Sequence, residues 1–284
     1  MKKRFFIAAL TVLILCPAAT AFAGNGKSQG QNGDSRKEQN VSLRVLFIGD
    51  SVTDGAWGRS AGSSLPSEKR DRHDLNHIFG HSYMMLCAAR LGSENPEAGV
   101  EFMNRGISGD DISRMEQRWD KDVIALKPDV LSVLFGTNDV HYHLQQGGNG
   151  FDVAGWEKRY RALLDRARAA NPEVKLVLGT PFVAKAGWVG ASDDYPERAR
   201  LVSELGAAVG AIARDYNAVL LRYDSLFAAQ GKAHPLVPMS HWIWDGIHPT
   251  AAGHQLMADL WVDRCRDILR AGGCVAAPVV KTGR

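Results

Sequence analysis

Short, mainly apolar runs recur along the chain, and the longer stretches between them have a different apolar spacing. An unbroken apolar run bounded by glycine or proline is typical of a strand that is buried on both faces, as in a parallel sheet. The first run leads directly into Gly49. The pattern predicts five strands, at residues 45–49, 100–103, 130–135, 174–178 and 218–221.

The stretches that separate these runs carry apolar residues at steps of three and four, which is the spacing of an amphipathic helix. Pro128 ends one of them, since proline cannot continue a helix. The predicted helices cover residues 81–91, 112–126, 156–167, 201–212 and 250–271. Strands that alternate with helices predict an α/β fold, in which helices cover both faces of a central parallel sheet of about five strands.

Three segments show neither periodicity, and we predict them to be loops: residues 56–80, 141–150 and 182–197. A long segment without periodicity inside a domain is usually either functional or mobile. The first of the three directly follows Ser51, so we expect it to form one wall of a site.

The two ends of the chain differ in composition from the periodic part. Residues 1–23 contain a basic start, a short apolar run and a small-residue cleavage site, which predicts a secretory signal peptide. A lipoprotein signal at Cys16 is the alternative. Residues 24–40 have no apolar side chain and are predicted to be a disordered polar spacer. A single domain is expected at 41–274, followed by a tail at 275–284.

The charge and the cysteine content limit the cellular compartments and the kinds of partner that we expect. The chain carries 34 basic and 31 acidic residues, and the predicted signal peptide contains three of the basic ones, so the remainder is formally neutral. This balance predicts no nucleic-acid partner. We expect an exported protein, periplasmic or extracellular, that does not stay inserted in the membrane after signal cleavage. Cys87 is predicted to be a buried free thiol, and a disulfide between Cys265 and Cys274 remains open.

Ser51 follows the first strand by two positions, where ligands of open α/β sheets bind. A serine hydroxyl needs a neighbouring base to act as a nucleophile, and a third group must orient that base. His248 can be the base and Asp245 can hold its other ring nitrogen. Asp50 and Asp54, on either side of Ser51, are interpreted as capping or turn residues.

Acyl transfer also requires hydrogen-bond donors for the oxyanion that develops on the substrate. We predict the backbone N–H of Gly106, the side-chain amide of Asn138 and the backbone N–H of Ser51. Each residue has a simpler interpretation when it is taken alone: Ser51 as a helix cap, Gly106 and Gly109 as turn glycines, and Asn138 as part of an Asx turn. Their occurrence together, at strand ends that a parallel sheet brings to one edge, favours a catalytic site.

Four segments resemble, in order, the conserved blocks of the SGNH (GDSL-type) hydrolase superfamily: Gly-Asp-Ser-Val at 49–52, Asn-Arg-Gly at 104–106, Gly-Thr-Asn-Asp at 136–139 and Asp-Gly-Ile-His at 245–248. The similarity extends over residues 43–270. It implies a three-layer, flavodoxin-like α/β/α fold that needs no metal and no cofactor. It also implies the triad Ser51, His248 and Asp245, with the oxyanion donors named above.

The expected substrate is a small-molecule or polysaccharide ester, and removal of O-acetyl groups from carbohydrates is the favoured reaction. Four tryptophans in predicted loops could bind sugar rings or could anchor the loops: Trp57, Trp188, Trp242 and Trp244. One alternative is a lysophospholipase or thioesterase for longer acyl chains. Another is a non-catalytic glycan-binding module. The oligomeric state does not follow from the sequence.

Overall fold

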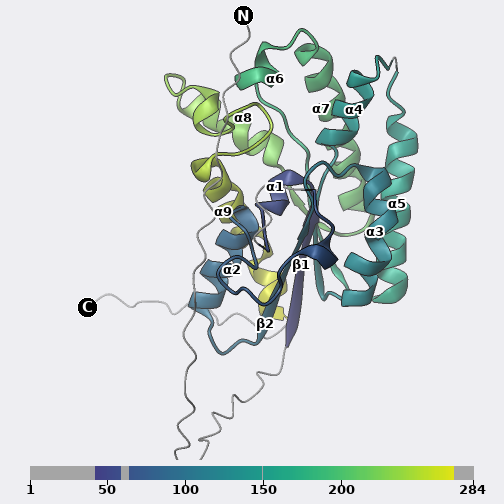
Figure 1. Cartoon of the computed structure of the whole chain (residues 1–284), viewed down its shortest axis with the longest axis vertical. Coiled ribbons are helices and arrows are strands. Elements are labelled where there is room, and N and C mark those ends of the chain that lie inside the picture. The colour runs from purple at the N-terminus through teal and green to yellow at the C-terminus, as the bar shows by residue number, and fades with distance from the viewer. Residues whose placement is uncertain (1–41, 59–63, 149, 272–284) are drawn as a thin grey trace, which may run out of the picture. The chain divides into compact units, whose positions relative to one another are not determined.

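A five-stranded parallel sheet forms the centre of the structure (Figure 1), a computed structural model that describes residues 42–58, 64–148 and 150–271. The strand order is β2-β1-β3-β4-β5, and every pair is parallel. The strands are β1 (Leu43–Gly49), β2 (Val100–Gly106), β3 (Val130–Leu134), β4 (Lys175–Gly179) and β5 (Val219–Leu221). The predicted parallel sheet of five strands is therefore confirmed.

Helices cover both faces of this sheet and complete three layers (Figure 1). One face packs against α2 (Tyr83–Glu94), α8 (Tyr223–Ala233) and α9 (Ala251–Ala271). The other face packs against α3 (Ile112–Asp122), α5 (Val153–Ala170) and α7 (Tyr195–Asp215). These layers confirm the predicted α/β/α architecture.

Strand β1 shows why the sequence requires cover on both sides. Successive side chains of a strand point to opposite faces. Val45 and Phe47 accordingly belong to the core under α2 and α9, whereas Leu46 and Ile48 belong to the core under α3 and α5, and all four are fully buried. Apart from the exposed Arg44, β1 carries apolar side chains on both faces, and such a strand is stable when helices cover both faces of the sheet.

Several segments differ from their predicted loop conformation. The segment predicted as a loop at 141–150 begins within α4 (Thr137–Gln145), and the segment at 182–197 contains α6 (Gly187–Ala191) and the start of α7. Helix α8 was not predicted. Part of α4 faces a cavity, and α6 is too short for an apolar stripe, so neither shows helical periodicity. The remaining short helices are α1 (Ser51–Asp54), η1 (Ser67–Lys69), η2 (Ile124–Leu126) and η3 (Met239–His241).

Some predictions concern segments that the structure does not describe. The predicted signal peptide at 1–23, the spacer at 24–40 and the tail at 275–284 lie outside the described residues, as does Cys274. Cys265 is a buried free cysteine among the described residues, and its pairing with Cys274, which the sequence left open, is not tested. Cys87 is a buried free thiol, as predicted.

A buried ion pair links the end of α1 to the segment that follows this helix. The carboxylate of Asp54, at the end of α1, lies 2.5 Å and 3.0 Å from the two terminal nitrogens of Arg70, and both side chains are completely buried. Asp54 Oδ2 also accepts hydrogen bonds from the N–H and the hydroxyl of Ser108, each at 2.8 Å. Asp54 is thus a structural residue with a larger role than the turn residue predicted.

We expect the substitution Asp54→Ala to lower the free energy of unfolding by about 3–5 kcal/mol, because it leaves the buried Arg70 guanidinium without its carboxylate. Urea denaturation followed by circular dichroism measures this change. Asp120→Ala is the matched control, since Asp120 pairs with Arg166 at an exposed position and surface pairs contribute little. Equal effects of the two substitutions would contradict the prediction.

Candidate active site

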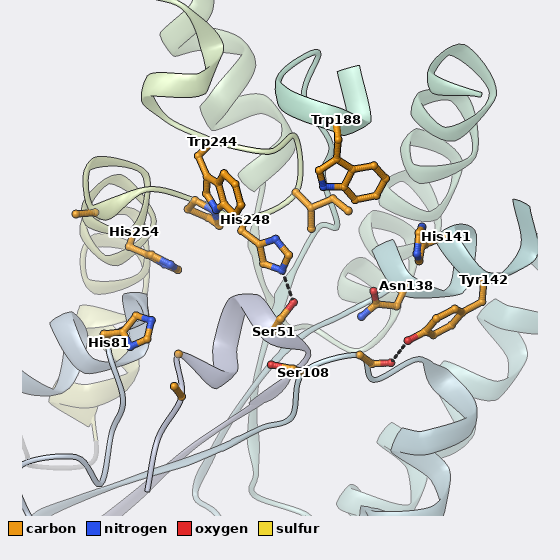
Figure 2. Close-up of a pocket in the computed structure, with 16 residues that line it drawn as sticks. Ser51, His81, Ser108, Asn138, His141, Tyr142, Trp188, Trp244, His248 and His254 are labelled. Carbon is orange, nitrogen blue, oxygen red and sulfur yellow. Dashed lines mark hydrogen bonds between the residues drawn. The ribbon is translucent and has the colours of Figure 1, made fainter. Parts of the chain in front are cut away.

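The site lies where the strand order reverses direction. Strands β1 and β3 are neighbours in the sheet, while the chain leaves β1 towards β2 and leaves β3 towards β4. Ligands of open α/β sheets bind at such a switch point, at the carboxyl ends of the strands. Ser51 follows β1 and Asn138 follows β3, and both line one cavity of about 680 Å³ (Figure 2).

Three of the predicted residues form a continuous chain of hydrogen bonds across this cavity. Ser51 Oγ lies 2.8 Å from His248 Nε2, and His248 Nδ1 lies 2.7 Å from Asp245 Oδ2. A carboxylate accepts hydrogen bonds, so Nδ1 is the nitrogen that carries the proton, and the neutral ring accepts at Nε2. The Ser51 hydroxyl can therefore donate its proton to His248 (Figure 2).

The turn that carries Asp245 and His248 is built by its own backbone. Asp245 Oδ1 accepts from the N–H groups of Ile247, at 2.9 Å, and His248, at 2.7 Å. Gly246 has a φ of +99°, which side-chain-bearing residues rarely adopt. Its missing Cβ also leaves room for the Ala186 carbonyl, because a Cβ there would lie 2.7 Å from that oxygen. The spacing of three residues therefore fixes the geometry of the pair.

The environment of the pair shifts both pKa values in the direction that favours catalysis. Burial by itself raises the pKa of Asp245, but the hydrogen bonds from the His248 ring and from the N–H groups of His248 and Ile247 outweigh it and lower the pKa to about 2. The hydrogen bond to Asp245 raises the pKa of His248, against the opposing effect of burial. Asp245 is thus ionised while His248 can gain and lose a proton.

Ser51 is the first residue of helix α1. Asp50 caps this helix, since its Oδ1 accepts from the Val52 N–H at 3.0 Å, as predicted for a capping residue. Burial raises the pKa of Asp50 to about 6, although the Val52 N–H and the charge of His248 act in the opposite direction. The N–H of Ser51 makes no backbone hydrogen bond among the described residues and is available to a ligand.

The structure corrects the prediction for Gly106. Its N–H donates to Asn104 Oδ1 at 2.8 Å, and the residue does not line the cavity. A Cβ at Gly106 would lie 2.3 Å from the Asp54 nitrogen, so this glycine is needed for the close packing of β2 against α1. The next glycine, Gly109, does line the cavity, has a φ of +85°, and its N–H makes no backbone hydrogen bond among the described residues.

Asn138 also lines the cavity, near the start of α4 (Figure 2). Its Nδ2 donates to the carbonyl of Asp110 at 3.0 Å. An amide NH₂ has two hydrogens, so one remains for a ligand. The cavity therefore brings together Ser51, Asn138 and His248 as predicted, with Gly109 in place of Gly106.

The four loop tryptophans fall into two classes. Trp188 and Trp244 line the cavity and are 50% and 59% exposed. Trp57 is completely buried and donates from Nε1 to the Gly106 carbonyl at 2.8 Å, and Trp242 is half-buried against the core. Trp57 and Trp242 therefore pack within the fold, whereas Trp188 and Trp244 lie where a ligand in the cavity could contact them. Of the described residues in the segment 56–80, which was predicted as a wall, only Ala56 lines the cavity.

Several polar residues of the cavity were not singled out as site residues by the sequence analysis. They are His81, Ser108, His141, Tyr142 and His254. Ser108 lies two residues after β2, and this position could have indicated it. His141 has its Nδ1 within 3.1 Å of the buried Arg198 guanidinium, and burial together with this charge lowers the pKa of His141. Among the residues described, no group of three potential ligands is arranged to hold a metal ion.

A hydrogen-bonded chain of serine, histidine and aspartate beside free N–H groups, at the switch point of a parallel sheet, is the arrangement expected of a serine hydrolase. The chain belongs to the GDSL-like lipase/acylhydrolase family, whose model matches residues 47–256. It is therefore a serine hydrolase of carboxylic esters, and not the non-catalytic binding module considered above. The predicted resemblance to the SGNH superfamily is confirmed.

One sequence relative and two solved structures illustrate the similarity. An acetylxylan esterase from Geobacillus stearothermophilus is 29% identical over 228 residues, which cover 76% of this chain and 90% of the relative. The crystal structure of a putative GDSL-like lipase from Parabacteroides merdae has a TM-score of 0.65 at 31% identity and covers 78% of this chain and 95% of its own. The crystal structure of an acetylxylan esterase from Geobacillus stearothermophilus has a TM-score of 0.61 at 27% identity, over 78% and 93% of the two chains.

We expect the catalytic activity to fall as the pH is lowered, with an apparent pKa for this loss above 6.5, the usual pKa of histidine. Protonated His248 cannot accept the Ser51 proton, and Asp245 raises the pKa of His248, so protonation begins at a higher pH than in an unpaired histidine. The pH profile of kcat/KM for p-nitrophenyl acetate measures this pKa in the free enzyme. An acid limb at or below pH 6.5, with an intact circular dichroism spectrum, would contradict the expectation.

Proposed function

We propose that this protein is an exported esterase that removes O-acetyl groups from carbohydrates through an acyl-enzyme. The observation that carries the proposal is the hydrogen-bonded chain of Ser51, His248 and Asp245 in a cavity bordered by two exposed tryptophans. The acetylxylan esterases among the relatives support the carbohydrate substrate.

In the first step, His248 Nε2 takes the proton of Ser51 while Ser51 Oγ forms a bond to the ester carbonyl carbon. The carbonyl π electrons move to the oxygen and give a tetrahedral oxyanion. The imidazolium of His248 then protonates the ester oxygen, the bond between carbon and this oxygen breaks, and the alcohol leaves. Asp245, which is ionised, stabilises the positive charge of His248 during this step.

In the second step, water is the nucleophile and Ser51 is the leaving group. Water donates a proton to His248 Nε2 and its oxygen attacks the acetyl-Ser51 carbonyl. Collapse of the second tetrahedral intermediate breaks the bond to Ser51 Oγ, and His248 returns the proton to it. Acetate is released and the resting hydrogen bond between Ser51 and His248 forms again.

The oxyanion is stabilised by three donors: the N–H groups of Ser51 and Gly109 and the Nδ2 amide of Asn138. All three residues line the cavity, and the two N–H groups are free of backbone partners among the described residues. The amide is held by the carbonyl of Asp110. Because these groups are fixed before substrate binds, they need little rearrangement when charge develops on the oxygen.

Several side chains of the cavity are of the kinds that bind sugars. Trp188 and Trp244 expose aromatic faces that can stack against sugar rings, and the histidines and Tyr142 offer hydrogen bonds to hydroxyl groups. Export rests on the predicted signal peptide at 1–23, and no helix in the described ranges is long and apolar enough to cross a membrane.

We expect p-nitrophenyl acetate to be hydrolysed faster than the butyrate, and the butyrate faster than the octanoate, with acetate also released from acetylated xylan. Ser51→Ala should reduce every one of these rates by about 10³-fold or more, because it removes the nucleophile. Ser93→Ala, at an exposed serine away from the cavity, is the control. Rates that increase with chain length would favour the lipid alternative, and turnover that survives Ser51→Ala would refute the mechanism.

Asn138→Ala should lower kcat by about 10²–10³-fold with little change in KM, because the amide interacts mainly with the charged oxygen of the transition state. Steady-state kinetics with p-nitrophenyl acetate separate the two parameters. Asn76→Ala, on an exposed turn outside the cavity, serves as the control. A change confined to KM would show that Asn138 binds the ground state instead.

A further inference from the structure

A second histidine of the cavity, His254, has a hydrogen-bond pattern opposite to that of His248. It lies in the first turn of α9, and its Nδ1 is 3.1 Å from the backbone nitrogen of Tyr83, the first residue of α2. The Tyr83 N–H is the donor, so His254 Nδ1 accepts and carries no proton. His248 Nδ1, in contrast, donates to Asp245.

His254 is therefore neutral, with its single proton on Nε2. Burial, with the neighbouring His81 and His248, lowers the pKa of His254 to about 4. Its position at the start of α2 acts in the same direction, since the positive end of a helix dipole disfavours a second positive charge. The Nε2–H has no hydrogen-bond partner among the described residues, and His254 lines the cavity.

The position of His254 places it near the alcohol part of a bound ester. Figure 2 shows His254 and His81 on one side of Ser51, and Asn138 and His141 on the other. The oxyanion is therefore bound on the side away from His254. The leaving oxygen must lie within reach of His248 Nε2, which protonates it, and His248 is near enough to His254 to contribute to the lowering of the His254 pKa. Groups attached beside the leaving oxygen thus come near His254.

We propose that His254 determines substrate specificity, because its Nε2–H donates a hydrogen bond to a free hydroxyl on the sugar carbon next to the acetylated one. This inference rests on the proposed function in carbohydrate deacetylation. The enzyme then prefers partly acetylated sugars over fully acetylated ones. A neighbouring acetyl group is larger, and its bridging oxygen is a weaker acceptor than a hydroxyl.

A neutral donor suits this position better than a charged one. During catalysis His248 becomes an imidazolium, and a second positive charge beside it would disfavour this state. A neutral imidazole binds a hydroxyl group without opposing that charge. The hydrogen bond from Tyr83 keeps His254 in the required tautomer, so the donor is oriented before the sugar binds.

Two substitutions separate the two hydrogen bonds of His254. In His254→Asn the side-chain oxygen takes the place of Nδ1, keeps the acceptor for Tyr83 and removes the donor in the cavity. In His254→Gln the longer amide places an N–H near the position of Nε2 and restores a donor. His73→Asn, at an exposed histidine that does not line the cavity, is the matched control.

The experiment measures kcat and KM for a monoacetylated methyl xyloside, for the fully acetylated xyloside and for p-nitrophenyl acetate, which has no neighbouring hydroxyl. In His254→Asn, kcat/KM for the monoacetylated sugar should fall about tenfold relative to that for p-nitrophenyl acetate, the value of one neutral hydrogen bond. The change should lie mainly in KM, and the preference over the fully acetylated sugar should disappear. His254→Gln should recover part of the kcat/KM for the monoacetylated sugar and part of the preference for it. His73→Asn should change neither of these quantities.

Equal losses on the sugar and on p-nitrophenyl acetate, or no loss on either, would overturn the proposal and leave His254 as a cap of α2. Thermal unfolding of both variants identifies such a structural effect, because only His254→Gln removes the acceptor for Tyr83. Failure of the proposed function looks different. In that case the wild-type protein itself would hydrolyse p-nitrophenyl acetate but neither xyloside.

Discussion

The hydrogen bond from His248 Nδ1 to Asp245 determines the chemistry of the whole cavity. It fixes the tautomer of the ring, raises the pKa of His248 and leaves Nε2 as the acceptor for the Ser51 hydroxyl. The carboxylate is itself held by two backbone N–H groups of the same turn. A short segment of irregular backbone, positioned by the start of α9, thus converts an ordinary serine at a strand end into a candidate nucleophile.

His254 has the opposite hydrogen-bond pattern to His248. Its Nδ1 accepts from a helix N-terminus, so the ring is neutral and directs a donor into the cavity. The two histidines lie only six positions apart in the sequence, yet they receive opposite roles. Sequence alone cannot assign these roles, because they depend on whether the atom facing each Nδ1 is a carboxylate oxygen or a backbone N–H.

The block Asn104 to Gly106 supports the site without entering the cavity. The Asn104 amide donates to the carbonyls of Thr53, Asp54 and Phe79, and its oxygen accepts from the Gly106 N–H. These contacts hold the C-terminal end of α1, the helix that begins with Ser51. Gly106 was a reasonable prediction for an oxyanion donor, since glycine exposes its N–H. The structure does not place Gly106 in the cavity: this last residue of β2 packs against α1 and donates its N–H to Asn104, whereas Gly109, three residues later, lines the cavity.

The sequence by itself determined the layered α/β fold, the five strands and the juxtaposition of Ser51, Asn138 and His248, because apolar periodicity and strand order decide which chain ends share a sheet edge. It could not identify α4 and α6 as helices, since one faces a cavity and the other is too short for a period. Nor could it separate Trp188 and Trp244 from Trp57 and Trp242. Those distinctions depend on contacts between residues far apart in the chain, such as Trp57 with Gly106 and His254 with Tyr83. Only the tertiary structure decides them, because burial and hydrogen-bond partners belong to the folded neighbourhood of a residue and not to its local sequence.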